Sequence, residues 1–297
     1  MQEIERIGHL LGDEKVTDVL IDSASRIHVE RDGSLTQVNE VFADETDLKS
    51  WIHSVISGGG GRLDLAQPLS EVSLFTDFGL LRVHAVLAGQ CSPTTKVSIR
   101  RHPAQSLSLQ ELQSKGAISQ EQLNLLHWIL SSKENYVIVG GTGAGKTTLL
   151  RALLNEVASE RIITLEENYE LQLPGNSIAL QTRENNQEGV GSISLTTLLR
   201  NALRMRPDRI VIGEARGEEL LLLLQSLNTG HNGAGFTLHA NSQRDALPRM
   251  IGILNFSGVS SHVASALIAS AIQWVIEVRR TSEGRKVVAI ERLHVEL

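Results

Sequence analysis

The amino-acid sequence predicts an α/β protein with two domains, and three observations support this fold class. The chain has 297 residues, 41% hydrophobic and 21% charged, as in an ordinary globular protein with room for a substantial core. Its first hundred residues alternate short strands with one helix. From Tyr136 onward strands alternate with helices, which is typical of a largely parallel sheet with right-handed crossovers. We therefore expect a small α+β domain at residues 1–101, a linker at 102–106 and an α/β domain at 107–297.

The elements of the N-terminal domain follow from strand, turn and capping signals. Asp32-Gly33 and Asp77–Gly79 predict two hairpin turns. Asp44 can cap a helix, and the four glycines Gly58–Gly61 after that helix predict a flexible turn. The strands form a mostly antiparallel sheet and are expected at Val16–Ile21, Arg26–Arg31, Leu35–Val38 and Lys96–Arg101.

The C-terminal domain begins with two helices. One lies near Leu107–Ser114 and the other starts at Ser119, where Ser119 and Gln122 have the spacing of a capping box. The apolar run Leu220–Leu224 suits a buried helix, and Ser282–Gly284 predicts a terminal hairpin. Strands are expected at Tyr136–Val139, Ile162–Leu165, Ile210–Gly213, Phe236–Leu238, Gln273–Arg280 and Arg285–Val295.

A glycine-rich turn separates the strand at Tyr136–Val139 from a helix whose leucines repeat at helical spacing. Strand, glycine turn and helix form a unit that cradles phosphates, because glycines let backbone N–H groups converge on one anion at a helix N-terminus. Lys146 would reach the β- and γ-phosphates, and the Thr147 hydroxyl would ligate Mg²⁺. A nucleoside triphosphate is therefore expected to bind Gly140, Gly141, Thr142, Gly143, Ala144, Gly145, Lys146, Thr147 and Thr148.

Three further strands end in residues that phosphoryl chemistry can use, and ligands of open α/β sheets bind beyond the carboxyl ends of the strands. Glu214 is expected to hold an Mg²⁺-bound water or to orient the attacking water, so it joins Thr147 as an expected metal residue. Glu166 and Glu167 end another strand, and since successive strand residues point to opposite faces, at most one of them faces the nucleotide. His239 is expected to sense the γ-phosphate. The alternatives are capping or interface roles for the acids and a structural hydrogen bond for the histidine.

Two groups of arginines have alternatives that the sequence leaves open. Arg82, Arg100 and Arg101 form either surface salt bridges or a set that stabilises charge on a transferred phosphoryl group from a second domain or subunit. The arginines of the segment 200–209 have no interleaved aromatic residues for base stacking, which favours a solvated or subunit-facing helix end over nucleic-acid binding. These are Arg200, Arg204, Arg206 and Arg209.

The charge and the apolar runs limit the classes of partner. A net charge of −6 provides no global basic field for nucleic acid or anionic lipid, so no direct nucleic-acid partner is expected. The longest apolar stretches, Leu220–Leu224 and Ala264–Ile272, fall short of the ~20 residues that span a bilayer. Any membrane association is therefore expected to come through a partner protein. The single cysteine, Cys91, excludes an internal disulfide framework and suits a reducing cytoplasm.

Four motifs follow one another along the chain. They are a Walker A loop at 140–148, an acidic box at Ile163–Leu171, a Walker B segment at Pro207–Gly217 and a histidine box at Gly230–Asn241. With these motifs, nearly the whole chain from Val16 onward resembles the type II/type IV secretion ATPases. The segments Thr182–Gly189 and Asn201–Arg209 are most similar to the ATPases of Tad/Flp pilus assembly (CpaF/TadA type), and nearly as similar to conjugation-type secretion ATPases.

This resemblance implies a RecA-like P-loop NTPase domain, a PAS-like N-terminal domain and a ring-shaped homohexamer that hydrolyses ATP with Mg²⁺. It also implies a place on the cytoplasmic face of a membrane, against a polytopic inner-membrane platform protein. Two positions depart from the family pattern, because Glu167 stands where aspartate is usual and Phe236 where a small residue is common. The family roles carry over to Lys146, Thr147, Glu166, Glu214, His239, Arg82 and either Arg100 or Arg101.

The leading hypothesis is an ATP-hydrolysing motor that powers pilus assembly or protein secretion. A conjugation-type ATPase and a pilus-retraction motor remain alternatives, since they share fold and chemistry. A nucleotide-gated scaffold that does not hydrolyse ATP is a third, and the presence of Lys146, Glu214 and a second acidic strand end argues against it. The net acidity argues against a nucleic-acid translocase.

Overall fold

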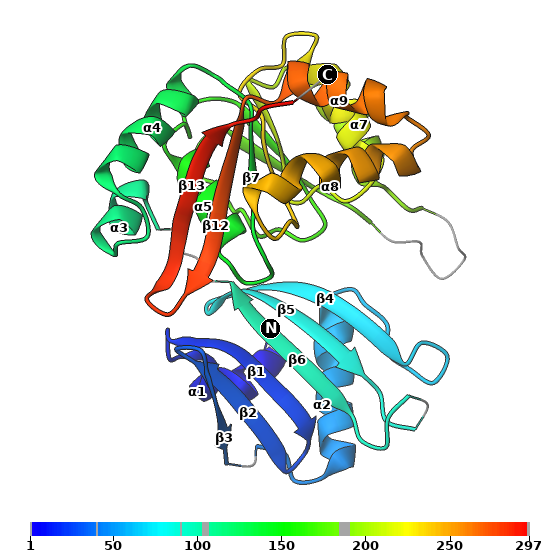
Figure 1. The fold of residues 1–297 in the computed structure, drawn as a ribbon. Coiled ribbons are helices and arrows are strands. Elements are labelled where there is room, and N and C mark those ends of the chain that lie inside the picture. Colours follow the sequence, from blue (N-terminus) through cyan, green and yellow to red (C-terminus); the bar gives the residue numbers. More distant parts are fainter. Residues whose placement is uncertain (1, 40, 90, 103–106, 184–190, 296–297) are drawn as a thin grey trace. The chain divides into compact units, whose positions relative to one another are not determined.

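The computed structural model describes residues 2–39, 41–89, 91–102, 107–183 and 191–295 (Figure 1). The chain divides into two compact units, Met1–Gln105 and Ser106–Leu297, which we call unit 1 and unit 2. Of the linker expected at 102–106, His102 ends a strand, and the other four positions lie outside the described residues.

Unit 1 is built on an antiparallel sheet, and its described part has six strands in the order β3-β2-β1-β6-β5-β4. All neighbouring pairs run antiparallel. The two hairpins expected at Asp32-Gly33 and Asp77–Gly79 are confirmed, since they join β2 to β3 and β4 to β5. The strands are β1 (Val16–Ser23), β2 (Arg26–Arg31), β3 (Ser34–Val38), β4 (Leu69–Thr76), β5 (Gly79–Val86) and β6 (Lys96–His102).

Helix α2 (Glu45–Gly58) packs on one face of this sheet (Figure 1). It begins as the sequence predicts, because the Asp44 carboxylate accepts a hydrogen bond of 2.9 Å from the backbone N–H of Asp47. The sequence did not predict η1 (Gln2–Ile7) and α1 (Gly8–Leu11), which add Ile4, Ile7 and Leu11 to the same core. The Trp51 indole ties α2 to this N-terminal segment by donating to the Glu3 carbonyl at 2.7 Å.

Two of the four glycines at the end of α2, Gly59 and Gly61, serve close packing, which the sequence did not indicate when it suggested a flexible turn. A Cβ atom on Gly61 would lie 2.6 Å from Cγ1 of Val72, and one on Gly59 would lie 2.8 Å from Cβ of the same valine. Both distances are far shorter than a carbon–carbon contact. Glycine is therefore needed here so that the end of α2 can approach β4.

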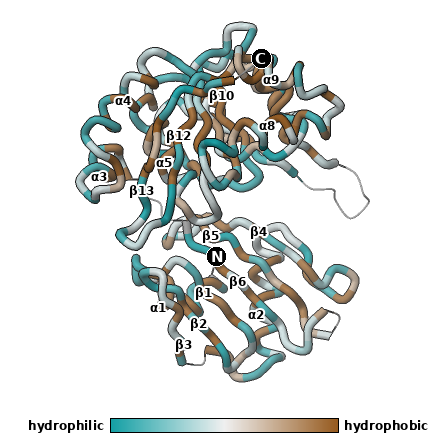
Figure 2. Tube along the Cα trace, viewed as in Figure 1, coloured by the Kyte–Doolittle hydropathy of each residue, from teal (hydrophilic) through white to brown (hydrophobic). Residues whose placement is uncertain are grey.

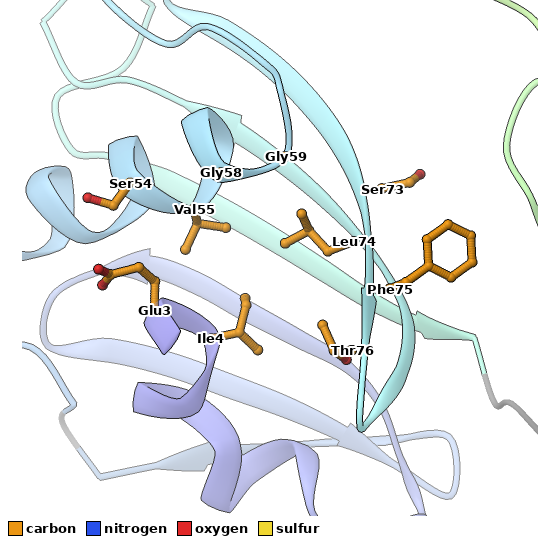
Figure 3. Close-up of a pocket in the computed structure, with 10 residues that line it drawn as sticks. All are labelled: Glu3, Ile4, Ser54, Val55, Gly58, Gly59, Ser73, Leu74, Phe75 and Thr76. Carbon is orange, nitrogen blue, oxygen red and sulfur yellow. The ribbon is translucent and has the colours of Figure 1, made fainter. Parts of the chain in front are cut away.

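A pocket of unit 1 lies between η1, the end of α2 and β4 (Figure 3). Its centre is apolar, with the side chains of Ile4, Val55 and Leu74 converging on it, while the Phe75 ring points away. Glu3 is the charged residue of the lining, and the described lining contains no lysine or arginine. This pocket therefore lacks the positive charge that a triphosphate requires.

Unit 2 contains a mostly parallel sheet, and the described residues place seven strands in the order β13-β12-β7-β11-β10-β8-β9. The neighbouring pairs from β12 to β9 run parallel, and β13 is antiparallel to β12 through the expected terminal hairpin. Strand β9 was not predicted from the sequence. The strands are β7 (Tyr136–Val139), β8 (Ile162–Glu166), β9 (Ser177–Gln181), β10 (Arg209–Ile212), β11 (Gly235–Leu238), β12 (Trp274–Thr281) and β13 (Gly284–Arg292).

Helices cover both faces of this sheet and bury two apolar cores. Val137 and Val139 of β7 pack with α6 to α9 on one face, and Tyr136 and Ile138 pack with α3 to α5 on the other. Strands such as β10 are accordingly strongly hydrophobic in Figure 2. The helices are α3 (Leu109–Ser114), α4 (Gln120–Ser131), α5 (Lys146–Asn155), α6 (Leu195–Ala202), α7 (Glu219–Leu227), α8 (Gln243–Phe256) and α9 (Ser261–Ala271).

One sequence expectation about unit 2 is wrong. Arg209 was grouped with a solvated or subunit-facing helix end, but it is the first residue of β10 and is buried. Its guanidinium pairs with Glu160 at 2.9 Å and donates to the Leu130 carbonyl at 2.7 Å, so its charge is compensated inside the unit. Phe236, which stands where the family commonly has a small residue, lies within β11 and its side chain is buried in the core with residues of α6 to α9.

Candidate nucleotide-binding site

The glycine turn of unit 2 connects the carboxyl end of β7 to the first residue of α5, Lys146. Gly145 precedes the helix with a φ of 101°, a left-handed conformation that other residues rarely adopt. A Cβ atom on Gly140 would lie 2.3 Å from the carbonyl oxygen of Val278 in β12. The turn is therefore shaped both by its own backbone and by the neighbouring strand.

Lys146 lies inside this turn. Its Nζ donates to the carbonyl oxygens of Gly140 at 2.9 Å and Gly141 at 3.1 Å, and it lies 3.5 Å from Nδ1 of His239. Burial lowers the pKa of Lys146, while the nearby Glu214 carboxylate opposes that effect. An ammonium group that is hydrogen-bonded to carbonyl oxygens at the N-terminus of a helix can exchange these hydrogen bonds for bonds to the oxygens of a phosphate.

The order of the strands brings His239 and Glu214 to this lysine. Strand β11 lies beside β7 with Leu238 opposite Val139, so His239 follows next to the glycine turn. Strand β10 lies on the other side of β11, and the Glu214 carboxylate comes 3.2 Å from Nε2 of His239. Lys146, His239 and Glu214 thus form a continuous series of contacts at the carboxyl edge of the sheet, although they are far apart in the sequence.

The surroundings of His239 lower the pKa of its imidazole, which favours the neutral ring. Burial lowers its pKa first, and the positive charge of Lys146 lowers it further, while Glu214 acts in the opposite direction. The nearby cations Arg216 and Arg249 also lower it. A neutral ring between a lysine and a carboxylate can accept at one nitrogen and donate at the other, which is what sensing a phosphate oxygen requires.

Glu166 and Glu167 point in different directions from the end of β8, as consecutive strand residues do. Glu167 makes a salt bridge of 3.2 Å with Arg216. Glu166 is only 3% exposed, and its carboxylate accepts hydrogen bonds from the Thr164 hydroxyl and from the backbone N–H groups of Glu170 and Leu171 at 2.8–3.0 Å. In this structure Glu166 anchors the loop that follows β8, and burial raises the pKa of its carboxyl to about 7.

Replacing Glu166 by glutamine is expected to remove a pH dependence of folding stability. A folded-state pKa of about 7 against an ordinary value of 4.5 means that the native state binds the proton more tightly. This contribution is therefore complete below pH 4.5 and is lost as the pH rises towards 7, by an amount of the order of 3 kcal/mol. Glutamine resembles the protonated acid, so urea unfolding of Glu166→Gln should change much less between pH 5 and pH 7.5 than that of the wild type.

The neighbouring variant Glu167→Gln is the control for that experiment, because the Glu167 side chain is exposed. It should keep the pH dependence of the wild type. If the free energy of unfolding changes equally with pH in the wild type and in Glu166→Gln, Glu166 is not the group that titrates.

A second pocket lies over the glycine turn and supplies room for phosphate oxygens. Arg249 of α8 lines it and adds positive charge beside Lys146 and His239. The lining comprises Gly140, Gly141, His239, Ala240, Asn241, Asp245 and Arg249. This pocket therefore has the charge that the pocket of unit 1 lacks.

The donor set beside Lys146 fits Mg²⁺. Magnesium prefers oxygen ligands, keeps several waters and is bound by one or two protein groups together with phosphate oxygens. Thr147 follows the lysine with a hydroxyl, and Glu214 supplies a carboxylate on the adjoining strand end. No cluster of three or more acidic, histidine or cysteine ligands that could hold a metal by itself occurs among the described residues. The site therefore suits a metal that arrives with a nucleotide.

Sequence reasoning missed three side chains that shape this region. Arg216 binds both oxygens of Glu214, at 2.7 and 2.8 Å, and its spacing of two residues from Glu214 was the available signal. Arg285 of β13 donates from Nε to the carbonyl of Gly143 at 2.9 Å. The buried Glu277 of β12 accepts from the backbone N–H of Gln243 at 2.9 Å, which fixes the start of α8 close after His239. The last two depend on the terminal hairpin, so local sequence gave no signal for them.

The arginines proposed from unit 1 have partners within that unit. Arg82 and Arg100 are opposite each other on β5 and β6, and they pair with Glu71 at 2.7 Å and Asp18 at 2.9 Å. The next residue, Arg101, points to the other face of the sheet. It donates to the carbonyl oxygens of Phe78, Leu11 and Asp13 at 2.7–3.1 Å. The guanidinium of Arg101 is therefore used to hold the N-terminal segment and a hairpin turn in place.

Comparison with known families decides the class of protein to which this geometry belongs. The profile of the family described as type II/IV secretion system protein matches residues 2–284, which is almost the entire chain. The chain belongs to the type II/IV secretion system protein family. Consistent with this family, a putative conjugal transfer protein of Mycobacterium tuberculosis H37Rv is 36% identical over 283 residues, covering 93% of this chain and 80% of that protein.

Two solved structures show that this chain has a known fold. The pilus retraction motor PilT with bound ADP matches with a TM-score of 0.71 at 22% identity, covering 99% of this chain and 83% of PilT. The Legionella pneumophila ATPase DotB matches with a TM-score of 0.70 at 20% identity, covering 99% of this chain and 80% of DotB. The chain thus has the mixed α/β fold of these ATPases. None of its described helices is both long and apolar enough to cross a bilayer.

Proposed function

We propose that this secretion protein hydrolyses ATP as a homohexameric motor that powers pilus assembly or protein secretion at the cytoplasmic face of a cell membrane. The observation that carries the proposal is the series of contacts from Lys146 through His239 to Glu214 beside the glycine turn. These three residues supply a cation for phosphates, a neutral imidazole and a carboxylate within one small region. ATP hydrolysis by P-loop proteins uses a lysine on the phosphates and a residue that positions the attacking water, and Lys146 and Glu214 can supply these two functions.

The proposed roles follow from these positions. The N–H groups of residues 140–148 receive the phosphates, and Lys146 exchanges its bonds to Gly140 and Gly141 for bonds to the β- and γ-phosphates. His239 reads the γ-phosphate, and Glu214 holds the attacking water or a water on the metal. Mg²⁺, bound by Thr147 and linked to Glu214, would neutralise charge that develops on the phosphate oxygens. Glu166 takes the role of loop anchor, although a pKa of about 7 also leaves it able to accept a proton.

We further propose that Arg82 and Arg100, rather than Arg101, are the unit 1 arginines that approach a nucleotide in the ring. They share a sheet face, and the side chain of Arg100 is 60% exposed, whereas Arg101 is bound to three carbonyl oxygens. Such arginines stabilise charge on a transferred phosphoryl group. The PAS-like description of unit 1 belongs to the same proposal, supported by an antiparallel sheet with one long helix across it.

A conjugation-type secretion ATPase is the second candidate. The observation that favours it is the 36% identity with a protein described as a putative conjugal transfer protein. Fold and site chemistry are the same for both candidates, so the identity of the transported cargo separates them. The partner in either case is a polytopic membrane platform protein, with this chain bound to its cytoplasmic side. Neighbouring genes for pilins would support the pilus-assembly hypothesis, and neighbouring genes for conjugation would support a conjugation-type ATPase.

Purified protein is expected to release phosphate from Mg–ATP and to assemble into particles six times the 32.4 kDa mass of one chain. Phosphate release measures the first property, and light scattering with a non-hydrolysable ATP analogue measures the second. Turnover no higher than that of Lys146→Ala would favour a nucleotide-gated scaffold. Strong, salt-sensitive stimulation of hydrolysis by single-stranded DNA would instead support a nucleic-acid translocase.

A further inference from the structure

Arg216 binds the carboxylate of Glu214, the group that the proposed function links to the metal. Its Nε lies 2.7 Å from Oε1 of Glu214, and its Nη2 lies 2.8 Å from Oε2. His239 adds a contact of 3.2 Å from Nε2 to Oε1. A carboxylate offers about four lone-pair positions, so three donors use most of its capacity. A bidentate guanidinium is also the strongest of the common partners of a carboxylate.

Arg216 has a second acidic partner on the neighbouring strand end. Its Nη1 lies 3.2 Å from Oε2 of Glu167, which follows β8. Both side chains are about half exposed, at 55% for Arg216 and 51% for Glu167. They have room to move towards each other, because neither is enclosed by the core.

The backbone of Arg216 is fixed, in contrast to its side chain. The buried carboxylate of Glu219 accepts from the backbone N–H groups of Arg216 and Gly217 at 2.7 and 2.8 Å. This carboxylate lies at the start of α7 and fixes the turn between β10 and that helix. The guanidinium can therefore shift between two acids while the chain that carries it stays in place.

We propose that Arg216 competes with Mg²⁺ for the carboxylate of Glu214, and that Glu167 receives the guanidinium when metal-bound nucleotide enters. The physical reason is that a guanidinium bound to both oxygens of Glu214 leaves few lone pairs for a metal-bound water, and its charge repels a divalent cation brought to the same carboxylate. Arg216 is thus a positioning residue for Glu214, and its guanidinium moves to Glu167 when metal-bound nucleotide binds. The inference rests on the proposed function, since it assumes that a nucleotide binds beside Lys146.

Binding of a fluorescent ADP analogue at increasing Mg²⁺ concentration tests this competition without requiring hydrolysis. Arg216→Gln should lower the Mg²⁺ concentration that half-completes the metal-dependent gain in affinity, by about 3- to 10-fold. Glu167→Gln should raise it about threefold, because the guanidinium then lacks its second acceptor. In the double variant Arg216→Gln, Glu167→Gln, the change at position 167 should have no further effect on the midpoint, because the guanidinium that Glu167 would bind is absent. Arg200→Gln, on the exposed side of α6, is the matched control and should leave the midpoint unchanged.

Each other outcome overturns the inference. A higher midpoint in Arg216→Gln would mean that the arginine helps Glu214 to bind metal, and additive effects in the double variant would mean that Glu167 acts independently. Equal affinity for the analogue in EDTA shows that the variants keep an intact site, so an unchanged midpoint counts against the competition itself. If the wild type binds no ADP analogue, the proposed function fails and this inference fails with it. If the wild type binds but all midpoints agree, the competition fails alone.

Discussion

Replacing Lys146 by alanine is expected to weaken ATP binding by about 10- to 100-fold and to reduce turnover below about 1% of the wild-type rate. The ammonium group is the cation enclosed by the glycine turn, where it is bound to the carbonyls of Gly140 and Gly141. Its removal leaves the β- and γ-phosphates without their charge partner in a partly desolvated region. Burial lowers the pKa of Lys146. A bound phosphate would oppose this effect, because its negative charge favours the charged form of the lysine.

Two measurements separate this effect from a loss of folding. Thermal unfolding without nucleotide compares the stability of the variant with that of the wild type, and calorimetric titration with ADP measures binding directly. Lys115→Ala, at an exposed position after α3, is the control for loss of one positive charge. Wild-type affinity for ATP in a folded Lys146→Ala protein would place the nucleotide somewhere other than the glycine turn.

The sequence predicts that Lys146, His239 and Glu214 lie close together, because this arrangement depends on local pattern and on one rule of topology. A strand, a glycine turn and a helix are adjacent in the chain, so the position of Lys146 follows from residues 136–157 alone. The approach of His239 and Glu214 follows from the convergence of parallel strand ends at one edge of a sheet. Neither step needs knowledge of distant side chains. The chemical roles of these residues remain predictions that the experiments above address.

What the sequence misses depends on contacts between segments that are far apart. Arg209 looks solvated in an arginine-rich stretch, and its partner Glu160 lies 49 residues earlier, in the connection between α5 and β8. The support of the glycine turn by Val278 and Arg285 depends on how the terminal hairpin lies beside β7. The need for glycine at Gly61 likewise becomes visible only when β4 is in place. Local patterns do not contain this information.

Glu166 shows a different limit, in which the position is predicted but the environment is not. The sequence places it at a strand end near the site, and the structure confirms that it ends β8. Its carboxylate nevertheless accepts from two backbone N–H groups of the following loop and from the Thr164 hydroxyl of β8, and burial raises its pKa to about 7. A strand-end acid can therefore act in loop anchoring as well as in chemistry, and periodicity does not distinguish the two.

Glu214→Gln is expected to preserve nucleotide binding within about threefold and to slow hydrolysis by about 100-fold or more. Glutamine keeps the size of the side chain but removes the negative charge that faces His239 at 3.2 Å and Arg216 at 2.7 Å. Binding depends mainly on the glycine turn and on Lys146, so it should survive this change. Hydrolysis depends on a carboxylate that can hold the attacking water or a metal-bound water, so the chemical step should become much slower. Single-turnover phosphate release, with analogue binding measured in parallel, separates the two quantities.

The adjacent variant Glu218→Gln is the matched control for Glu214→Gln, because Glu218 is exposed and its side chain does not cap α7. It should hydrolyse ATP at the wild-type rate. Glu214→Asp keeps the charge but shortens the side chain by one methylene, so it should also lose rate if the position of the carboxylate matters. Normal hydrolysis by Glu214→Gln would transfer the role to the other strand-end acids. Of these, Glu166 has a pKa near neutrality and would become the first candidate for accepting the proton of the attacking water.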